Sequence, residues 1–439
     1  MGNGLRRGCF CPRAVKKEIM EVKRIDLSAL VRPNKGLIGK AIFSDEDVYR
    51  RELQQVFARC WLYLGHESQL PQENDFFTSL MGADPVIVTR SGGKVRAFLN
   101  SCTHRGMKVC RTDRGNAADF TCPYHGWCFS SSGDLVGVPG MREAYNNKLD
   151  TKEWGLKEVA HLDTFHGLIF ATWSAEAPSL ATYLGDMTVY LDRMLNRMEG
   201  GVEMIGAIQK WEMPVNWKLI AENFVGDSYH VGTTHGSVVD IGFRKRPKKE
   251  GYQISIHGGH GFGSELGGFG ASATPTPYET YLDTVRAKLA AASNPVDQFI
   301  PLGHGTIFPN MSFLDGVKFR MIRMSHPRGP GMTESHTMCF VDKALPEHLR
   351  DEVRKSFILA FGPSGMFEVE DGEVWGEVCD GLRGHVAASM DFNYQMGLGQ
   401  DVPVSEKFGG GLPGRTGGYW SEGNQREYYR RWLELMEAK

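Results

Sequence analysis

The two most informative segments of the chain are CTHRG at residues 102–106 and CPYHGW at residues 122–127. Each segment offers one cysteine and one histidine, so together they supply four ligands for a metal. Two kinds of site use this donor set: a tetrahedral zinc site and a Rieske [2Fe-2S] cluster, in which two cysteines bind one iron and two histidines the other. Zinc sites usually keep their cysteines in one pair and their histidines in another. The mixed loops therefore favour the cluster, and Gly106 and Gly126 allow the backbone to approach it closely.

The sequence around these loops indicates a small all-β unit. Short apolar stretches at 61–64, 85–88, 95–99 and 167–173 alternate with clusters of glycine, asparagine, aspartate and serine. Helical spacing of apolar residues predicts helices over about 45–58, 180–195 and 426–436. Strand-like pieces recur over 305–340. We expect the Gly-rich stretch at 253–275, with His257 and His260, to be a mobile surface loop rather than a lid over a pocket.

Composition excludes several classes of function. The chain has 439 residues, a formal net charge of -2 and no apolar run long enough to span a bilayer. We therefore expect neither a nucleic-acid nor a membrane partner. Nine cysteines, an odd number in a long chain, do not indicate a disulfide framework, and a reducing cytoplasm is the expected location. Residues 1–19 differ from the rest and are predicted to be a disordered or non-native extension.

A second metal site is suggested by His230 and His235. On one regular helix their side chains would diverge by roughly 140°, so they converge only if the helix breaks between them, and Gly232 is placed to allow that. The alternative is two unrelated histidines. A carboxylate would complete a 2-His-1-carboxylate iron site. Residues 365–378 offer one on a helix whose predicted buried face carries Phe367, Val374, Trp375 and Val378, but periodicity does not separate Glu370 from Asp371.

These motifs resemble those of the large (alpha) subunits of Rieske non-haem iron aromatic-ring-hydroxylating dioxygenases, the group of naphthalene and biphenyl dioxygenases. The resemblance extends from about Asp45 to the C-terminus. It implies an α+β fold in which an all-β Rieske [2Fe-2S] domain, residues 59–177, is inserted in a catalytic domain, residues 20–58 and 178–439, with an antiparallel sheet flanked by helices.

The resemblance also implies roles for individual residues. The [2Fe-2S] ligands are Cys102, His104, Cys122 and His125, and the ligands of a mononuclear Fe(II) are His230, His235 and Asp371. Asp227 corresponds to the acid that links a Rieske histidine of one subunit to an iron histidine of its neighbour, and Asn223 is a second candidate catalytic residue. The residues expected to line the substrate pocket are Asn223, Phe224, Phe361 and Phe367.

By this resemblance the chain is expected to be a terminal oxygenase that uses O2 and electrons from a ferredoxin to cis-dihydroxylate an aromatic substrate, with bicyclic and polycyclic arenes as candidates. The alternative on the same scaffold is a Rieske monooxygenase acting on a substituted or carboxylated arene such as salicylate. A third hypothesis, an electron carrier or zinc-stabilised binding module, leaves the second set of ligands unexplained. Expected partners are a small beta subunit, in an alpha3beta3 assembly, and a ferredoxin served by an NAD(P)H-dependent reductase.

Overall fold

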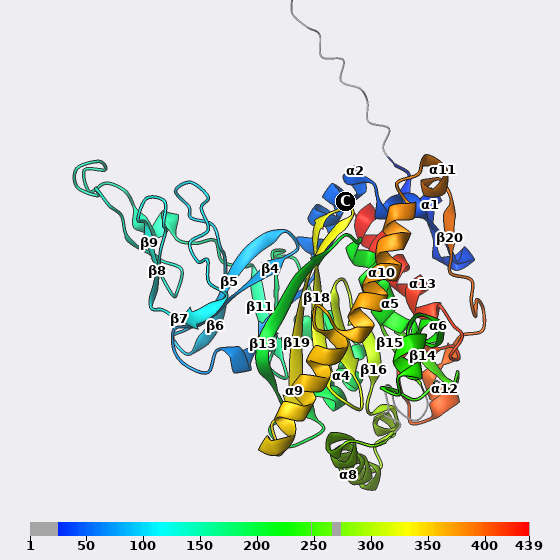
Figure 1. The fold of residues 1–439 in the computed structure, drawn as a ribbon. Helices are drawn as coiled ribbons and strands as arrows, with labels where there is room; N and C mark the ends of the chain where they lie inside the picture. The colour runs from blue at the N-terminus through cyan, green and yellow to red at the C-terminus, as the bar shows by residue number, and fades with distance from the viewer. Residues whose placement is uncertain (1–24, 247, 266–273, 439) are drawn as a thin grey trace, which may run out of the picture.

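A computed structural model describes residues 25–246, 248–265 and 274–438 (Figure 1). It combines a strand-rich part, at the left of Figure 1, with a larger body in which helices cover a long antiparallel sheet. This confirms the predicted α+β class. The segment 1–19, predicted to be an extension, lies outside the described residues. The domain boundaries at 59–177 stay a prediction.

The strand-rich part is built from short antiparallel strands around its own apolar core. Phe76, Ile87, Phe98, Phe120 and Phe129 belong to this core. One sheet has the order β6-β5-β4-β7, a second β10-β9-β8, and a third β11-β12-β3. Their bounds are β3 (Leu62–His66), β4 (Asp75–Met81), β5 (Asp84–Ser91), β6 (Lys94–Leu99), β7 (Arg114–Asn116), β8 (Asp119–Thr121), β9 (Cys128–Ser130), β10 (Leu135–Gly137), β11 (His161–Phe165) and β12 (Leu168–Thr172).

The larger body is organised by a sheet of nine strands in the order β13-β19-β18-β17-β16-β15-β14-β22-β21. The strands are β13 (Val202–Met213), β14 (Gly251–Ile256), β15 (His260–Glu265), β16 (Gly303–Ile307), β17 (Met311–Asp315), β18 (Arg320–Gly329), β19 (Met332–Asp342), β21 (Val402–Pro403) and β22 (Arg415–Thr416). Side chains alternate between the faces of a strand. Met321 and Cys339 accordingly enter one hydrophobic core, and Ile322 and Met338 enter the other. Both faces of the central strands are therefore buried.

Helices cover the face of the sheet that carries the candidate site. They are α5 (Trp217–Gly226), α9 (Glu347–Phe361), α10 (Met366–Gly381) and α13 (Gly423–Glu437), and Figure 1 shows α9 and α10 crossing in front of the sheet. The other helices are α1 (Leu27–Leu30), α2 (Glu46–Glu52), α3 (Leu180–Leu184), α4 (Met187–Asn196), α6 (Val231–Thr234), α7 (Gly236–Asp240), α8 (Pro277–Ala292), α11 (His385–Ala388) and α12 (Val404–Phe408). A small sheet joins β1 (Val31–Arg32), β2 (Leu37–Gly39) and β20 (Asp391–Asn393). Among the described residues, no helix is long and apolar enough to cross a membrane.

A buried charge holds the end of α2 against α5 and α13. Glu52 accepts hydrogen bonds from Lys218 Nζ at 2.7 Å, from Trp217 Nε1 at 2.9 Å and from Trp432 Nε1 at 2.9 Å. A buried carboxylate is costly unless it is paired and hydrogen-bonded, and here both of its oxygens have donors. This network fixes the start of α5, which leads directly into the candidate site.

Two expectations about local structure are wrong. The first half of the stretch predicted as a mobile loop at 253–275 is the hairpin of β14 and β15, which pair from Gly251↔Glu265 to Ile256↔His260, and residues 266–273 of that stretch lie outside the described residues. Glycines are needed there because neighbouring atoms approach closely: a Cβ at Gly263 would lie 1.9 Å from the side-chain oxygen Oε1 of Gln253, and one at Gly261 would lie 3.0 Å from the Ile254 carbonyl oxygen. The helix predicted over 180–195 is two helices, because Gly185 has a φ of 49° and ends α3. The helix predicted over about 45–58 comprises α2 and a wider helical turn at Leu53–Phe57.

Candidate metal centres

The two loops that carry the first motif have the same backbone geometry. In the first loop the Cys102 N–H donates to the Met107 carbonyl and the Gly106 N–H to the Cys102 carbonyl. In the second, Cys122 pairs with Trp127 and Gly126 with Cys122 in the same way. Gly106 and Gly126 have φ values of 73° and 74°, a conformation that favours glycine. The repeated turn explains why each motif places a glycine four residues after its cysteine.

The four predicted donors of this site converge. Cys102 and Cys122 are buried free thiols, and burial together with the nearby Cys122 sulfur raises the pKa of the Cys102 thiol. The rings of His104 and His125 lie edge to face with centroids 4.6 Å apart. His104 Nδ1 is buried without a hydrogen-bond partner among the described residues. A buried, unpartnered ring nitrogen beside two thiols fits a [2Fe-2S] cluster held by two cysteines and two histidines.

The second pair of histidines is brought together by an interrupted helix. After α5, a short 3-10 helix spans Ser228–His230, and α6 follows over Val231–Thr234. His235 then leaves the helical conformation, with φ -103° and ψ 32°, before α7 begins. The chain therefore breaks at His235 and not at Gly232, which lies inside α6. This break brings the His230 and His235 rings together, with their centroids 5.2 Å apart.

Asp371 completes this group. His230, His235 and Asp371 each offer a ligand atom, and these atoms lie within 4.8 Å of one another. Asp371 Oδ1 is 3.5 Å from His230 Nε2 and 3.2 Å from His235 Nε2. Burial raises the pKa of Asp371, but the two imidazoles outweigh it and hold the pKa of this carboxyl below its usual range. Such a group of two imidazoles and one carboxylate fits non-haem iron.

The structure of α10 distinguishes Glu370 from Asp371, which the periodicity of the sequence did not. Glu370 Oε2 accepts a hydrogen bond from His235 Nδ1 at 2.8 Å, on the side of the ring away from Asp371, and Glu370 also accepts from the Ser237 hydroxyl. The buried face of α10 consists of Phe367, Glu368, Asp371 and Trp375. The expectation that Val374 belongs to this face is wrong: it lies at the edge and is 45% exposed.

Each imidazole also has a carboxylate partner on its far nitrogen. His230 Nδ1 is hydrogen-bonded to the main-chain carbonyl of Asp227, whose carboxylate Oδ1 lies 3.4 Å away, and His235 Nδ1 lies 2.8 Å from Glu370 Oε2. Burial lowers the pKa of His230, but Asp227 and Asp371 together raise it to about 10. Carboxylates in this outer position fix the orientation of a ligating histidine and increase its basicity. The arrangement leaves both Nε2 atoms directed at Asp371.

The predicted pocket residues divide into two groups. Phe361 and Phe367 stack with centroids 5.4 Å apart, and Phe367 lies 4.8 Å from the His235 ring. Both line a small apolar cavity of about 20 Å³, together with Phe243, Leu314, Gly316, Val317, Lys318 and Phe319. Phe224 packs on Phe361 from α5. Asn223 instead lies with its Nδ2 3.5 Å from His230 Nδ1. The aromatic walls therefore begin beside the metal group.

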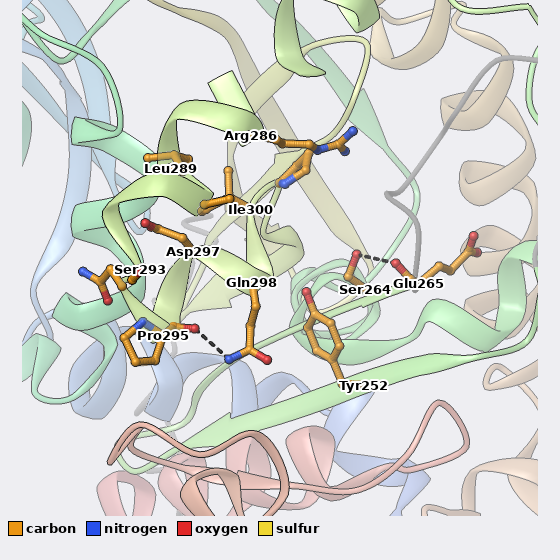
Figure 2. A pocket seen from close by; sticks show the side chains of 13 residues that line it. Tyr252, Ser264, Glu265, Arg286, Leu289, Ser293, Pro295, Asp297, Gln298 and Ile300 are labelled. Atoms are coloured by element: carbon orange, nitrogen blue, oxygen red, sulfur yellow. Dashed lines mark hydrogen bonds between the residues drawn. The ribbon is translucent and has the colours of Figure 1, made fainter. Parts of the chain in front are cut away.

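A larger cavity of about 690 Å³ lies between α8 and the β14–β15 hairpin (Figure 2). Tyr252, Glu265, Arg286 and Asp297 are among the residues that line it. None of its lining residues is a predicted site residue. Its mixture of charged and polar groups also differs from the apolar walls beside His235.

Sequence reasoning missed His304, which is buried beside the metal group. His304 Nδ1 donates to the Phe224 carbonyl at 2.9 Å, and its Nε2 lies 2.8 Å from Ser228 Oγ. Burial lowers its pKa to about 4, so the ring is neutral at physiological pH. The only signal in the sequence is a histidine within a strand-like Gly-His-Gly segment. Its hydrogen bond to Phe224 connects β16 to the end of α5.

Comparisons with known proteins agree with this geometry. A model of the family described as ring hydroxylating alpha subunit (catalytic domain) matches residues 184–438, and one of the Rieske [2Fe-2S] domain matches residues 60–162. The chain is 41% identical over 429 residues to the biphenyl 2,3-dioxygenase subunit alpha of Rhodococcus jostii, which covers 94% of this chain and 92% of that protein.

It is also 41% identical over 433 residues to the benzene 1,2-dioxygenase subunit alpha of Pseudomonas putida, covering 95% of this chain and 94% of that one. The solved structure of naphthalene 1,2-dioxygenase from Rhodococcus sp., bound to indole, matches with a TM-score of 0.82 and 36% identity. This match covers 92% of the present chain and 95% of that chain.

Proposed function

Because the chain belongs to the family of ring-hydroxylating alpha subunits, we propose that it is the terminal oxygenase of a dioxygenase that converts an aromatic substrate and O2 to a cis-dihydrodiol. It carries a Rieske [2Fe-2S] domain and a catalytic domain of the kind that binds mononuclear iron. The observation that carries the proposal is the group of three donor atoms from His230, His235 and Asp371, all within 4.8 Å, beside an aromatic wall.

Each residue of the two sites has a defined task in this proposal. Cys102, His104, Cys122 and His125 hold the cluster, and the group of His230, His235 and Asp371 holds the iron. When bound, the cluster supplies electrons one at a time and the iron supplies the site of O2 chemistry. Asp227 and Glu370 hold the two imidazoles in orientation. Phe361 and Phe367 exclude water and stack on the substrate ring, Phe224 supports them from behind, and Asn223 holds the His230 side of the site.

The placement of the two sites supports electron transfer between copies of the chain. In Figure 1 the strands β8 and β9, which flank the second cluster loop, lie at the far left, whereas α6 and α10 lie right of the centre. A cluster in the same chain is therefore remote from the iron group. Asp227 is partly exposed, so a neighbouring copy has access to it. We propose that this neighbour supplies the cluster, within an alpha3beta3 assembly.

The electron donors belong to the same proposal. A ferredoxin reduces the cluster, and an NAD(P)H-dependent reductase serves the ferredoxin. The cytoplasmic location expected from cysteine usage also remains a proposal. Bicyclic and polycyclic arenes are the proposed substrates, because the aromatic side chains beside His235 suit flat apolar rings.

Product analysis under ¹⁸O2 tests the activity. The oxygenase is supplied with ferredoxin, reductase and NADH, and offered benzene, biphenyl, naphthalene and salicylate. We expect a cis-dihydrodiol that contains two ¹⁸O atoms, and no product from Asp371→Ala, which should keep the visible absorption of the cluster. Incorporation of a single ¹⁸O from O2 would refute dioxygenation, and turnover by Asp371→Ala would refute the ligand assignment.

Mixed assemblies test the electron path. His104→Ala chains lack a cluster and Asp371→Ala chains lack the iron site, so neither alone is active. If electrons cross between chains in a head-to-tail ring, random mixed assemblies recover about a quarter of the wild-type rate, since an intact iron site then meets an intact neighbouring cluster in one case in four. Electron transfer inside each chain predicts no recovery.

A further inference from the structure

The turn between β17 and β18 carries a lysine that is buried. The Gly316 N–H donates to the Phe319 carbonyl at 3.1 Å and closes this turn. Turns normally run over the surface of a protein and leave their charged side chains in water. Lys318, however, is only 8% exposed, and its neighbours Val317 and Phe319 are 3% and 4% exposed. The whole turn therefore lies in the protein interior, together with the charge of Lys318.

The buried ammonium of Lys318 has only weak partners. Its Nζ donates to the Phe243 carbonyl and lies 3.6 Å from the centroid of the Phe243 ring. In the part of the chain that the structure describes, Lys318 forms no ion pair. Burial lowers the pKa of this ammonium, and the more distant Glu279 offsets only part of the shift. Because a buried charge is costly unless it is paired, this ammonium is suited to receive an anion.

The cavity that Lys318 lines adjoins the proposed iron site. Lys318, Phe361 and Phe367 all line the apolar cavity of about 20 Å³. The rings of Phe361 and Phe367 are nearly parallel, with 9° between their planes, and Phe367 packs against the His235 ring. Among the described residues that line this cavity, only Lys318 carries a charge. Its ammonium is therefore the single charged group in an aromatic cavity that extends to the metal group.

This combination of groups matches one class of ligand. Binding pockets for small molecules have mostly apolar walls and a few polar groups that fix the orientation of the ligand. The parallel rings of Phe361 and Phe367 suit a flat arene, and the Lys318 ammonium suits an anion. A carboxylate conjugated to an arene is nearly coplanar with it and accepts strong, charge-assisted hydrogen bonds from an ammonium. An aromatic carboxylate therefore matches both parts of the cavity.

We propose that Lys318 binds the carboxylate of an aromatic acid, and that this contact selects such acids over neutral arenes. The inference rests on the proposed function, whose substrate class it narrows to arenes that carry a carboxylate. With its carboxylate on Lys318, the substrate ring lies along Phe361 and Phe367 and extends toward His235. The carboxylate is thereby held away from the metal group, and the ring carbons face it.

Phe243 controls access to the Lys318 ammonium. The cavity is smaller than a benzene ring requires, and the Phe243 ring, with its centroid 6.0 Å from that of Phe367, forms one of its walls. Phe243 is only partly buried, so its ring has room to turn aside. The entering carboxylate then takes over the contact with Nζ. This exchange replaces a cation–π contact and a bond to a neutral carbonyl by a charge-assisted hydrogen bond, which is stronger.

Equilibrium dialysis of the oxygenase, without O2 or an electron donor, tests the contact directly. The probes are naphthoate and naphthamide, its neutral isostere. We expect the wild type to bind naphthoate at least tenfold more tightly than naphthamide. Lys318→Met, which keeps the length of the side chain and removes its charge, should lose this preference and still bind naphthamide as the wild type does. Lys343→Met, which removes an exposed lysine after β19, is the matched control and should keep the preference.

The opposite results are equally definite. Equal affinity of the wild type for the two probes, binding of neither, or an unchanged preference in Lys318→Met would overturn the inference. If Lys318→Met does not fold, a crystal structure of the wild type with naphthoate decides. It should show a carboxylate oxygen within hydrogen-bond distance of Lys318 Nζ and the Phe243 ring turned aside, and a carboxylate bound elsewhere would overturn the inference.

These measurements separate the inference from the proposed function, because neither requires turnover. A wild-type oxygenase that binds naphthoate through Lys318 but forms no dihydrodiol from any arene would support the binding site and refute the proposed function alone. Dihydrodiol formation from neutral arenes by an oxygenase that does not prefer naphthoate would support the proposed function and overturn the role of Lys318.

Discussion

Replacement of Glu370 by glutamine measures how strongly an outer carboxylate supports the iron group. Glu370 accepts from His235 Nδ1 at 2.8 Å and from the Ser237 hydroxyl. Glutamine keeps an acceptor oxygen of similar reach but removes the negative charge. The His235 ring should therefore stay in place while its Nε2 becomes a weaker ligand.

The magnitude follows from the kind of hydrogen bond that is lost. Removing an outer partner of a ligating histidine typically costs 10- to 100-fold in metal affinity or activity, about 1.4–2.7 kcal/mol. Hydrogen bonds to an ionised group are about twice as strong as neutral ones. Glu370→Gln keeps a neutral hydrogen bond to His235 and should lower iron affinity ~10-fold. Glu370→Ala removes the hydrogen bond and should lower iron affinity ~100-fold.

Iron titration of the apo mononuclear site is the assay, with the cluster absorption as an internal reference for intact protein. Glu377→Gln, on the exposed side of α10, is the control and should match the wild type. If Glu370→Gln also matches the wild type, the supporting role is wrong. If Glu370→Gln binds no mononuclear iron while Asp371→Asn does, the two acids have exchanged roles and Glu370 is the ligand.

Other variants separate the two sites and the stability of the fold. Asp371→Ala should retain the visible absorption of the cluster and lose all turnover, measured as product formed. His104→Ala should lose that absorption as well as turnover, and retention of a Rieske electron paramagnetic resonance signal would contradict the assignment. Asp227→Ala should keep both metals but slow reoxidation of the reduced cluster in stopped-flow experiments; normal coupled turnover would remove its proposed role. Burial lowers the pKa of His260 to about 4. As the pH falls below about 6.5, His260 is therefore protonated in the unfolded chain while it stays neutral in the folded one. By pH 5 this difference lowers the free energy of unfolding by about 2 kcal/mol. The unfolding temperature of His260→Gln should fall less than that of the wild type between pH 7 and pH 5, and parallel profiles would contradict this account.

Candidate metal donors can be selected from the sequence because chemistry restricts which residues bind a metal. A [2Fe-2S] cluster with two histidine ligands needs cysteine and histidine in paired loops, and the motifs at 102–106 and 122–127 name both. The structure adds the reason for their spacing, since each glycine at the fourth position after the cysteine closes the same turn. From the sequence, His230 and His235 could be expected to converge only if the helix broke between them. The position of that break depends on how His235 packs against Phe367, which the sequence does not reveal.

The hairpin of β14 and β15 could not be found from composition. Glycine and histidine are typical of loops, and alternation of apolar residues is weak across Gly261–Gly263. In the structure these glycines leave space for the neighbouring backbone and for Gln253, while His260 Nδ1 accepts from the Phe308 N–H at 3.0 Å. The stabilising contacts come from β16 and the segment before Pro309, distant in sequence, so local pattern carried no signal for them.

A single turn of α10 explains why three acids so close in sequence have three different partners. Each residue advances the helix by about 100°, so Glu368, Glu370 and Asp371 leave it in different directions. They meet the Arg323 guanidinium, the far side of the His235 ring and both Nε2 atoms, respectively. The order therefore matters more than the composition: moving any of these carboxylates by one residue turns it away from its partner. A sequence can reveal that three acids are available, but only the packing of α10 places Glu368 at Arg323, Glu370 at the far side of the His235 ring and Asp371 between the two histidines.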